Sequence, residues 1–263
     1  MIKNNLGLKN VAVLLIGLML SLQAYCEPSK KDIQKLNNCL IFDLFINYEL
    51  SEKNGNLTTI IDFIPNLINL NYKTIRLTSN VGGENQVCNF IFNENGTIEN
   101  ISYGVNNRIY RYDFIYEGNR LTGVNIAGKP RISFGYNNMG QLITITRETN
   151  SAAFEYNFEY LDGDEKATIT LIVVQGEKRS PSSQKYFVTW QNDFKLESYC
   201  FDVYCSNNMK YTTQGDLLSY SFDSVNEDNN IVTWEYSKMD DKQNWIERYY
   251  KGDIVFNRTI EYK

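Results

Sequence analysis

One spacing recurs along the chain and restricts the folds that it can adopt: an aromatic residue, a glycine four positions later and an aliphatic residue six positions later. The clearest copies are Phe92, Gly96 and Ile98; Tyr136, Gly140 and Leu142; and Tyr211, Gly215 and Leu217. Trp190 and Leu196 keep the outer spacing, with Phe194 in the glycine's place. Glycine readily adopts the positive φ that a tight hairpin corner requires. Each copy therefore predicts two strands joined by a corner.

Seven such corners are predicted, near residues 95, 118, 139, 163, 193, 214 and 241. A regular period of this kind indicates one supersecondary unit repeated many times. The stretch YNNMGQLITI (136–145) contains a turn-prone segment and then an apolar alternation. We interpret it as a hairpin corner rather than as a glycine loop that holds a ligand.

The segments between the corners have the period of β-strands. In RIYRYDFIY (108–116) and AFEYNFEYLDG (153–163), aromatic residues alternate with charged or amide residues. Such alternation is typical of a strand with one buried face. The 19 Tyr and 14 Phe of the chain suit strands as well. We predict an all-β fold, a long antiparallel meander of about 14 strands in repeated hairpins; a sheet so wide should form a curled sheet, a shell or a barrel-like structure.

Two of these segments resemble a known repeat family. YDFIYEGNRLTGV (112–124) and ISFGYNNMGQLITITRE (132–148) are similar to the YD or RHS repeat. The ending DDKQNWIERYYKGDIVFNRTIEY (240–262) resembles the close of secreted proteins of the Bacteroidota with divergent units, although Gln243 replaces the glycine of their usual GNW turn. The resemblance covers residues 85–263. It implies antiparallel strands, often in a curled sheet or shell, and no particular activity.

The N-terminus carries an export signal. Lys3 and Lys9 precede the apolar run VAVLLIGLML (11–20), and the small residue Ala24 follows. This pattern predicts a signal peptide over residues 1–24 and a single β-rich domain over residues 25–263. A retained anchor is the alternative, although the run is shorter than the ~20 residues of a membrane-spanning helix. The mature protein is expected in the periplasm, at the cell surface or outside the cell.

The chain has five cysteines, and one of them lies next to the predicted cleavage site. Lipidation of Cys26 would anchor the protein to a membrane, but Tyr25 stands where a lipobox prefers a small residue, so ordinary cleavage is favoured. Cys200 and Cys205 are separated by an odd number of positions. Within one straight strand they would face opposite sides and could not form a disulfide.

The first part of the domain is less regular. Residues 29–52 could begin with a short helix after Ser29, although CLIFDLFINYEL (39–50) suits a strand pair equally well. We assign residues 29–84 to the first strands of the same sheet. Residues 175–185, QGEKRSPSSQK, are predicted to form a loop within the domain.

The composition excludes several kinds of chemistry. The chain has no histidine, which removes the commonest general base and the usual catalytic triads, and leaves few ligands for zinc. A net charge of -5 without a cationic cluster argues against nucleic acid as a partner. The pairs Asp162 with Asp164 and Asp240 with Asp241 could act in a glycan hydrolase. They lie at predicted corners, where Asp caps turns, so we expect no catalytic residue, no cofactor and no metal.

The aromatic faces offer the best candidate binding residues. If exposed, Tyr110, Tyr112, Tyr156 and Trp190 could form a platform on which sugar rings stack. If buried, they fill the core, which is the favoured interpretation because alternation already requires a buried face. The predicted function is binding or scaffolding in the cell envelope, with a glycan or another envelope protein as partner. Membrane contact is expected only through a lipid anchor.

An outer-membrane β-barrel is an alternative function. Its strands need an outward apolar band, whereas the outer faces predicted here hold tyrosine rather than leucine, and the chain ends in Lys263 instead of an aromatic residue.

Overall fold

The computed structural model describes most of the chain from residue 30 onward. The described ranges are 30–46, 71–79, 86–105, 108–161, 165–191, 194–201, 204–213, 216–224, 227–250 and 253–263. The predicted signal peptide (1–24) and Cys26 lie outside these ranges, as do Asp162 and Asp164.

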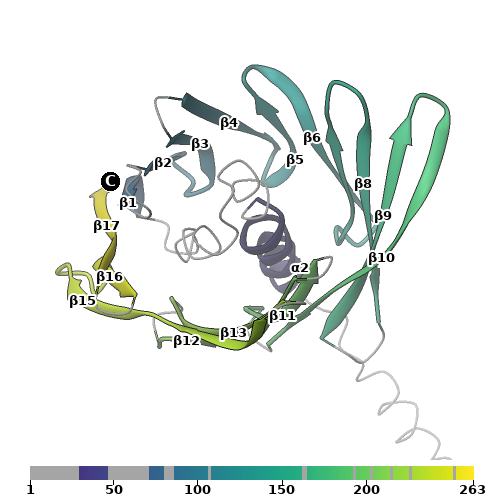
Figure 1. The fold of residues 1–263 in the computed structure, drawn as a ribbon. Coiled ribbons are helices and arrows are strands. Elements are labelled where there is room, and N and C mark those ends of the chain that lie inside the picture. The colour runs from purple at the N-terminus through teal and green to yellow at the C-terminus, as the bar shows by residue number, and fades with distance from the viewer. Residues whose placement is uncertain are drawn as a thin grey trace, which may run out of the picture.

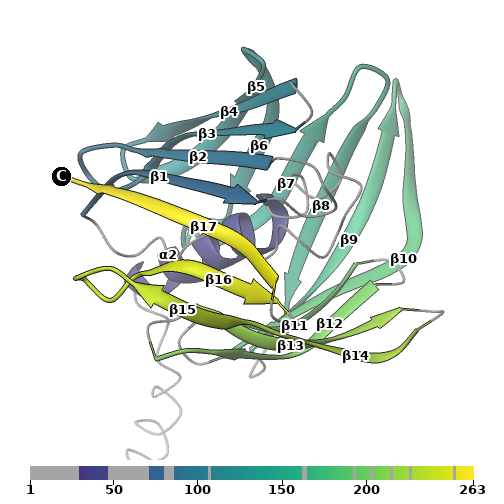
Figure 2. The same ribbon diagram turned by 60° about the vertical axis from the view of Figure 1, so that its left-hand side comes forward.

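Within these ranges, 17 strands form one antiparallel sheet, in agreement with the predicted all-β meander and with more strands than expected (Figures 1 and 2). The strands of the first half are β1 (Tyr72–Ser79), β2 (Gln86–Phe92), β3 (Ile98–Val105), β4 (Arg108–Glu117), β5 (Arg120–Ile126), β6 (Lys129–Tyr136), β7 (Leu142–Glu148), β8 (Ala153–Tyr160) and β9 (Lys166–Gln175). The remaining strands are β10 (Lys178–Trp190), β11 (Leu196–Phe201), β12 (Tyr204–Tyr211), β13 (Leu217–Ser224), β14 (Glu227–Thr233), β15 (Glu235–Met239), β16 (Trp245–Tyr250) and β17 (Asp253–Tyr262).

The sheet curls into a nearly closed barrel. Strands pair with their sequence neighbours from β1 through β14 and from β15 through β17, and β1 pairs with both β2 and β17. Strands β14 and β15 are consecutive and are separated only by Trp234, whose backbone N–H donates to the Leu218 carbonyl over 2.9 Å. The expectation that so wide a sheet must curl or close is confirmed.

The repeated spacing found in the sequence is a cross-strand pair at each corner. Tyr136 lies opposite Leu142, and Phe92 opposite Ile98, with the register shifting by one residue beside each pair. Gly140 adopts a φ of 84°, the conformation that the corner needs. YNNMGQLITI is therefore a hairpin corner, as predicted.

Two corners place a larger residue in the glycine's position. Phe194 has a φ of 63° and Gln243 has a φ of 64°, so both adopt the left-handed conformation that glycine adopts elsewhere. At the last corner Met239 pairs with Trp245, six positions later, and Gln243 lies four positions after Met239. The corners thus keep the backbone geometry of the repeat after losing its glycine.

The repeat tyrosines link each unit to the preceding one. The Tyr136 hydroxyl donates to the carbonyl of Leu121 over 2.6 Å, and the Tyr160 hydroxyl donates to that of Leu142 over 2.6 Å. Two further links of the same kind join Tyr211 to Leu196 and Tyr236 to Leu217. A tyrosine is therefore favoured at this position because its ring fills the interior while its hydroxyl satisfies a backbone acceptor.

A helical segment lies against the inner face of the barrel. The α-helix α2 (Lys30–Asn38) continues as a π-helix, η1 (Cys39–Ile46) (Figure 1). The ring of Phe42 contacts that of Phe114, and the ring of Phe45 contacts that of Tyr156. The assignment of residues 29–84 to the sheet is therefore wrong for this segment, and within that range the structure describes only β1 as a strand. A short apolar run is compatible with a buried helix as well as with a strand, and inside the barrel this one forms a helix.

The two faces of the barrel differ in polarity. Core residues such as Ile75, Phe90 and Ile145 are fully buried on the inner face. The outer face carries ion pairs in which the cationic side chain is exposed, and these are Lys73 with Glu261, Arg111 with Asp113, Arg179 with Glu155, and Lys238 with Glu247. The predicted alternation is confirmed in β4, where Tyr112 and Phe114 are buried and Arg111 is exposed.

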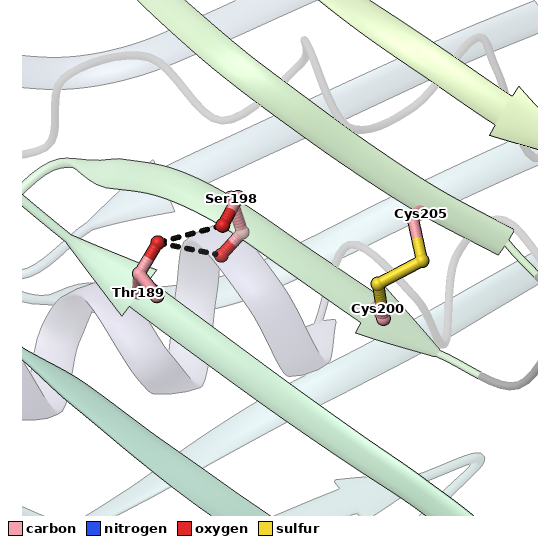
Figure 3. The surroundings of a disulfide bond; sticks show 4 residues. All are labelled: Thr189, Ser198, Cys200 and Cys205. Carbon is pink, nitrogen blue, oxygen red and sulfur yellow. Dashed lines mark hydrogen bonds between the residues drawn. A yellow bond between two sulfur atoms is a disulfide. The ribbon is translucent and has the colours of Figure 1, made fainter.

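One local prediction is wrong, and the single straight strand considered for Cys200 and Cys205 is not what they form. Residues 175–185 form a tight turn and part of β10 instead of a loop, because Gly176 adopts a φ of 59° and turns the chain within two residues. Cys200 and Cys205 form a disulfide, since the chain turns between them and they lie opposite each other on β11 and β12, with Cα atoms 4.1 Å apart (Figure 3). On the neighbouring strand pair, the Thr189 and Ser198 hydroxyls share a hydrogen bond of 2.7 Å.

Candidate binding site

Most of the predicted aromatic residues lie inside the barrel. Tyr112, Tyr156 and Trp190 are buried, and Tyr110 is half-buried and packs against the same core. Their positions agree with the interpretation that these residues fill the core, because all four follow the inward alternation of their strands. They do not form an exposed platform in this structure.

In the carboxylate pair at the last corner, Asp240 stabilises the turn by accepting hydrogen bonds. One oxygen of Asp240 accepts the backbone N–H groups of Lys242 and Asn244 over 2.9 and 2.8 Å, and the other accepts the hydroxyl of Tyr262. Burial raises the pKa of Asp240, but these hydrogen bonds outweigh it and the net pKa is lowered. Among the described residues, no group of three His, Cys, Asp or Glu side chains could hold a metal ion.

Two arginines lie buried on the inner wall of β16 and β17. The Arg248 guanidinium lies 3.5 Å from the centroid of the Trp234 ring and 5.1 Å from that of Phe256. The Arg258 guanidinium lies 4.1 Å from the ring of Trp245, and its Nε donates to the Trp245 carbonyl over 2.7 Å. Arginine stacks on aromatic rings more readily than lysine, so these side chains are both packing groups and charges.

Asp216 is the carboxylate of this cluster. Its Oδ1 accepts the indole N–H of Trp245 over 3.0 Å. Burial raises the pKa of Asp216, and the nearby charges of Arg258 and Arg248 counteract part of that increase. Burial also lowers the pKa of Arg258. The cluster therefore holds its charges in an apolar wall, where hydrogen bonds and rings replace water.

A cavity lies where α2 meets the corners of the barrel. Its volume is about 760 Å³, and its walls are α2, the start of η1 and three corners: β2/β3 near Asn95, β4/β5 near Asn119 and β6/β7 near Asn138. All three corners lie at the same end of the barrel, because each joins an even-numbered strand to the next in an antiparallel meander. We refer to this cavity as the corner cleft.

Hydrogen bonds fix the helix against the corners. The amide of Asn37 is buried; its Nδ2 donates to the Gly140 carbonyl over 2.8 Å and its Oδ1 accepts the Leu142 backbone N–H over 2.9 Å. Lys35 lies over the Phe194 ring at 5.9 Å. These contacts join two walls of the corner cleft, so its shape is set before any ligand arrives.

The corner cleft combines rings, amides and a cation. The Arg120 guanidinium lies 5.5 Å from the centroid of the Tyr136 ring. Burial raises the pKa of Tyr136 to about 12, and the neighbouring Arg120 acts in the opposite direction. Burial also raises the pKa of Tyr116. Both tyrosines therefore remain neutral hydrogen-bonding groups near pH 7.

The sequence interpretation missed the corner cleft. It identified the corners but treated their asparagines as turn residues, and it did not place a helix beside them. The abundance of asparagine at corners that share one end was the available signal, although the contribution of α2 depends on its insertion into the lumen.

A barrel filled by a helix and by inward rings is the class of fold that these observations define. No family model matches the chain, and no curated protein matches it either. A solved structure of a porin-like protein from Bacteroides uniformis is similar, with a TM-score of 0.47 and 13% identity over 72% of this chain and 98% of that one. Within the described residues, the helical segments are too short and insufficiently apolar to cross a membrane.

Proposed function

We propose that the protein is an exported, water-soluble barrel of the cell envelope with a binding or scaffold role. The observation that carries this proposal is the polarity of the two faces. A membrane barrel needs an outward apolar band and commonly has a polar lumen. Here the inner wall is apolar and packed, whereas charged and hydroxyl side chains lie along the outer wall.

Charges at mid-strand support this polarity argument. Arg111 and Asp113 lie in the middle of β4 and bond to each other across 2.6 Å on the outer face. In lipid, a charge at mid-strand costs about 2–4 kcal/mol for Arg or Lys. Thr170 is likewise exposed in the middle of β9. Exposed apolar residues such as Ile109, Ile115 and Ile231 occur on the outer face, and on β4 Arg111 and Asp113 separate Ile109 from Ile115.

The packed lumen argues for binding or support rather than transport. Phe42 and Phe45 of η1 contact rings on the inner wall, and Leu40 and Ile46 are fully buried. A solute path would require these side chains to leave the lumen. The proposal is therefore a non-catalytic, non-channel role in which the rigid barrel presents its corners.

Two further features support export. The predicted signal peptide directs the chain out of the cytoplasm. The Cys200–Cys205 disulfide is the kind of bond that persists in oxidising compartments. A relationship to YD or RHS repeats remains part of the proposal, with lipidation of Cys26 as the alternative to ordinary cleavage, and neither changes the polarity argument.

Fractionation of cells that express the full chain tests the proposal. The wild type and the Cys26→Ala variant should be extracted separately with aqueous buffer and with detergent. The expected result is that Cys26→Ala is recovered in aqueous buffer alone, whether or not the wild type carries a lipid anchor. An integral barrel would need detergent in both forms and would form conducting pores in planar bilayers, and that result would overturn the proposal.

A further inference from the structure

We propose that the corner cleft binds a neutral oligosaccharide. This inference rests on the proposed binding role and assigns it a site and a ligand class. It is supported by the amides at the rim, the apolar floor, the small net charge and the absence of a free strand edge in this part of the barrel.

The rim of the corner cleft is rich in side-chain amides. Those that line it and are exposed to solvent are Gln34, Asn38, Asn95, Asn119 and Asn138. Asn95 uses its Oδ1 to accept from Thr97, which leaves its NH₂ group available. The side chains of Asn119 and Asn138 make no hydrogen bond within the described part of the chain. The amides of Asn119 and Asn138 each offer a donor and an acceptor, which matches the two roles of a sugar hydroxyl.

The floor of the corner cleft is apolar. Ile41 and Phe42 come from η1 and Leu121 from β5, and all three are buried. The half-buried rings of Tyr116 and Tyr136 line the same space. An apolar floor with a few oriented polar groups is the usual composition of a ligand site, and ring faces suit the C–H surfaces of sugars.

The charge of the corner cleft favours a neutral ligand. The charged side chains that line the corner cleft are Lys35, Arg120 and Glu117, and their net charge is only +1. Lys35 and Arg120 each lie over an aromatic ring. An acidic ligand would meet only two cations, and both already interact with rings.

The strand pairing argues against an extended peptide as the ligand. Peptides commonly add a strand to a free sheet edge. Strands β2 to β7, which carry the three corners, are each paired on both sides. The corner cleft therefore offers side-chain amides and rings in place of a backbone ladder.

The contacts that hold the corner cleft make it rigid. Asn37 joins α2 to the β6/β7 corner, and the Tyr136 hydroxyl joins that corner to Leu121 at the next one. A preformed site avoids the ordering cost that a flexible one incurs on binding. The site is thus suited to read a ligand of fixed shape, such as a short run of linked sugar rings.

The test is direct binding by the mature chain, residues 25–263. An array of neutral glucan, mannan, xylan and galactan oligosaccharides, with acidic oligosaccharides and peptides on the same slide, should give binding to at least one neutral oligosaccharide. Calorimetry with that oligosaccharide should show a loss of about tenfold or more in affinity for Asn119→Ala combined with Asn138→Ala, because at least two hydrogen-bonding groups are removed.

The controls separate a lost site from a lost fold. Asn257→Ala removes an exposed amide from the outer face of β17 and should leave binding unchanged. Asn119→Asp with Asn138→Asp keeps the shape of the amides and removes their donors, so it should also weaken binding. The proposal is overturned by binding only to acidic oligosaccharides or peptides, by no binding at all, or by equal binding of the wild type and both double variants. None of these results bears on extraction without detergent, which tests the proposed function separately.

Discussion

The inner walls of β4–β8 and of β13–β17 face the same lumen but are packed with different groups. The first wall is lined mainly by aliphatic and aromatic side chains, with Arg147 beside the Phe154 ring, and Phe42 and Phe45 of η1 contact its rings. The second wall contains Arg248 and Arg258 among tryptophan and phenylalanine rings. The corners differ as well, since the β6/β7 corner has Gly140 where the β15/β16 corner has Gln243.

This difference shows two ways in which a wide barrel can fill its interior. Where a helix enters, aliphatic and aromatic side chains provide most of the packing, and the polar groups among them are tyrosine hydroxyls and the Asn37 amide. In the second wall, β13–β17, which we call the arginine wall, the long side chains of Arg248 and Arg258 fill part of the interior. Aromatic rings and one carboxylate compensate their charge. The stability contributed by the first wall, β4–β8, which we call the helix wall, should therefore depend on side-chain volume. The stability contributed by the arginine wall should depend on both side-chain volume and charge.

The largest effect is expected in the helix wall. Phe45 is buried at 1% exposure and contacts the Tyr156 ring with a centroid distance of 5.2 Å. Phe45→Ala should lower the free energy of unfolding by about 3–5 kcal/mol, because it leaves a cavity under the sheet. Urea denaturation measures this. Phe187→Ala, on the outer face, should change stability by no more than about 0.5 kcal/mol; equal effects at the two positions would contradict a helix-packed lumen.

The next effect separates volume from charge in the arginine wall. Arg248→Ala should cost on the order of 3 kcal/mol, since it removes a fully buried side chain that packs against Trp234. Arg248→Met keeps much of the volume and removes the charge, so it should cost clearly less. Thermal or urea unfolding of the two variants measures the two losses of stability. If methionine is as costly as alanine, the charge rather than the packing is the dominant contribution.

The strands and corners could be predicted because their signal is local. At the corners that keep the repeated spacing, an aromatic residue and an aliphatic residue six positions apart pair across the turn, so the spacing in the sequence is the spacing in space. Phe194 could be aligned with glycine for the same reason, whereas Gln243 was aligned through the resemblance to the GNW turn. The helical continuation over residues 39–46 could not be assigned, because these residues are apolar apart from Asp43 and only the surrounding barrel decides their conformation.

The candidate site was less predictable. The tyrosines at the corners were recognised, but their hydroxyl bonds to the preceding unit, such as Tyr136 to Leu121, depend on the neighbouring hairpin. The corner cleft needs Asn37 to hold α2 against Gly140, a contact across 103 positions. The disulfide was missed for a related reason, because the turn between Cys200 and Cys205 carries no glycine or proline.

A smaller effect should appear as a pH dependence of the arginine wall. Folding raises the pKa of Asp216 above its ordinary value of 3.8 because of burial, although Arg258 and Arg248 oppose the shift. A carboxyl with a raised folded pKa contributes stability below its unfolded pKa and loses that contribution as pH rises through the folded pKa. Asp216→Asn keeps an acceptor for Trp245 and cannot titrate.

The measurement is urea unfolding of the wild type and Asp216→Asn at several values from acid to neutral pH. Relative to the variant, the wild type should lose stability as pH rises through and above 3.8. The opposite slope would mean that attraction to the two arginines exceeds the cost of burying the carboxylate.

The smallest effect compares the two corners. Gln243 is exposed and holds a φ of 64°, so Gln243→Gly should stabilise the barrel by up to about 1 kcal/mol. Gly140→Ala should cost about 1 kcal/mol from backbone strain alone, since a Cβ there would meet no atom within 4 Å. Melting temperatures should therefore shift in opposite directions; a shift in the same direction for both would show that the corners are not equivalent.

The central claim is that the outer wall faces water and the inner wall forms the core. The most direct measurement places a spin label at Thr170→Cys, at an exposed position in the middle of β9, in a Cys26→Ala background. Its accessibility to a water-soluble nickel complex and to oxygen should be recorded with and without lipid vesicles. The label is expected to be highly accessible to the nickel complex, and vesicles should leave this accessibility unchanged. A label that becomes shielded from nickel and more accessible to oxygen when vesicles are added would contradict the central claim.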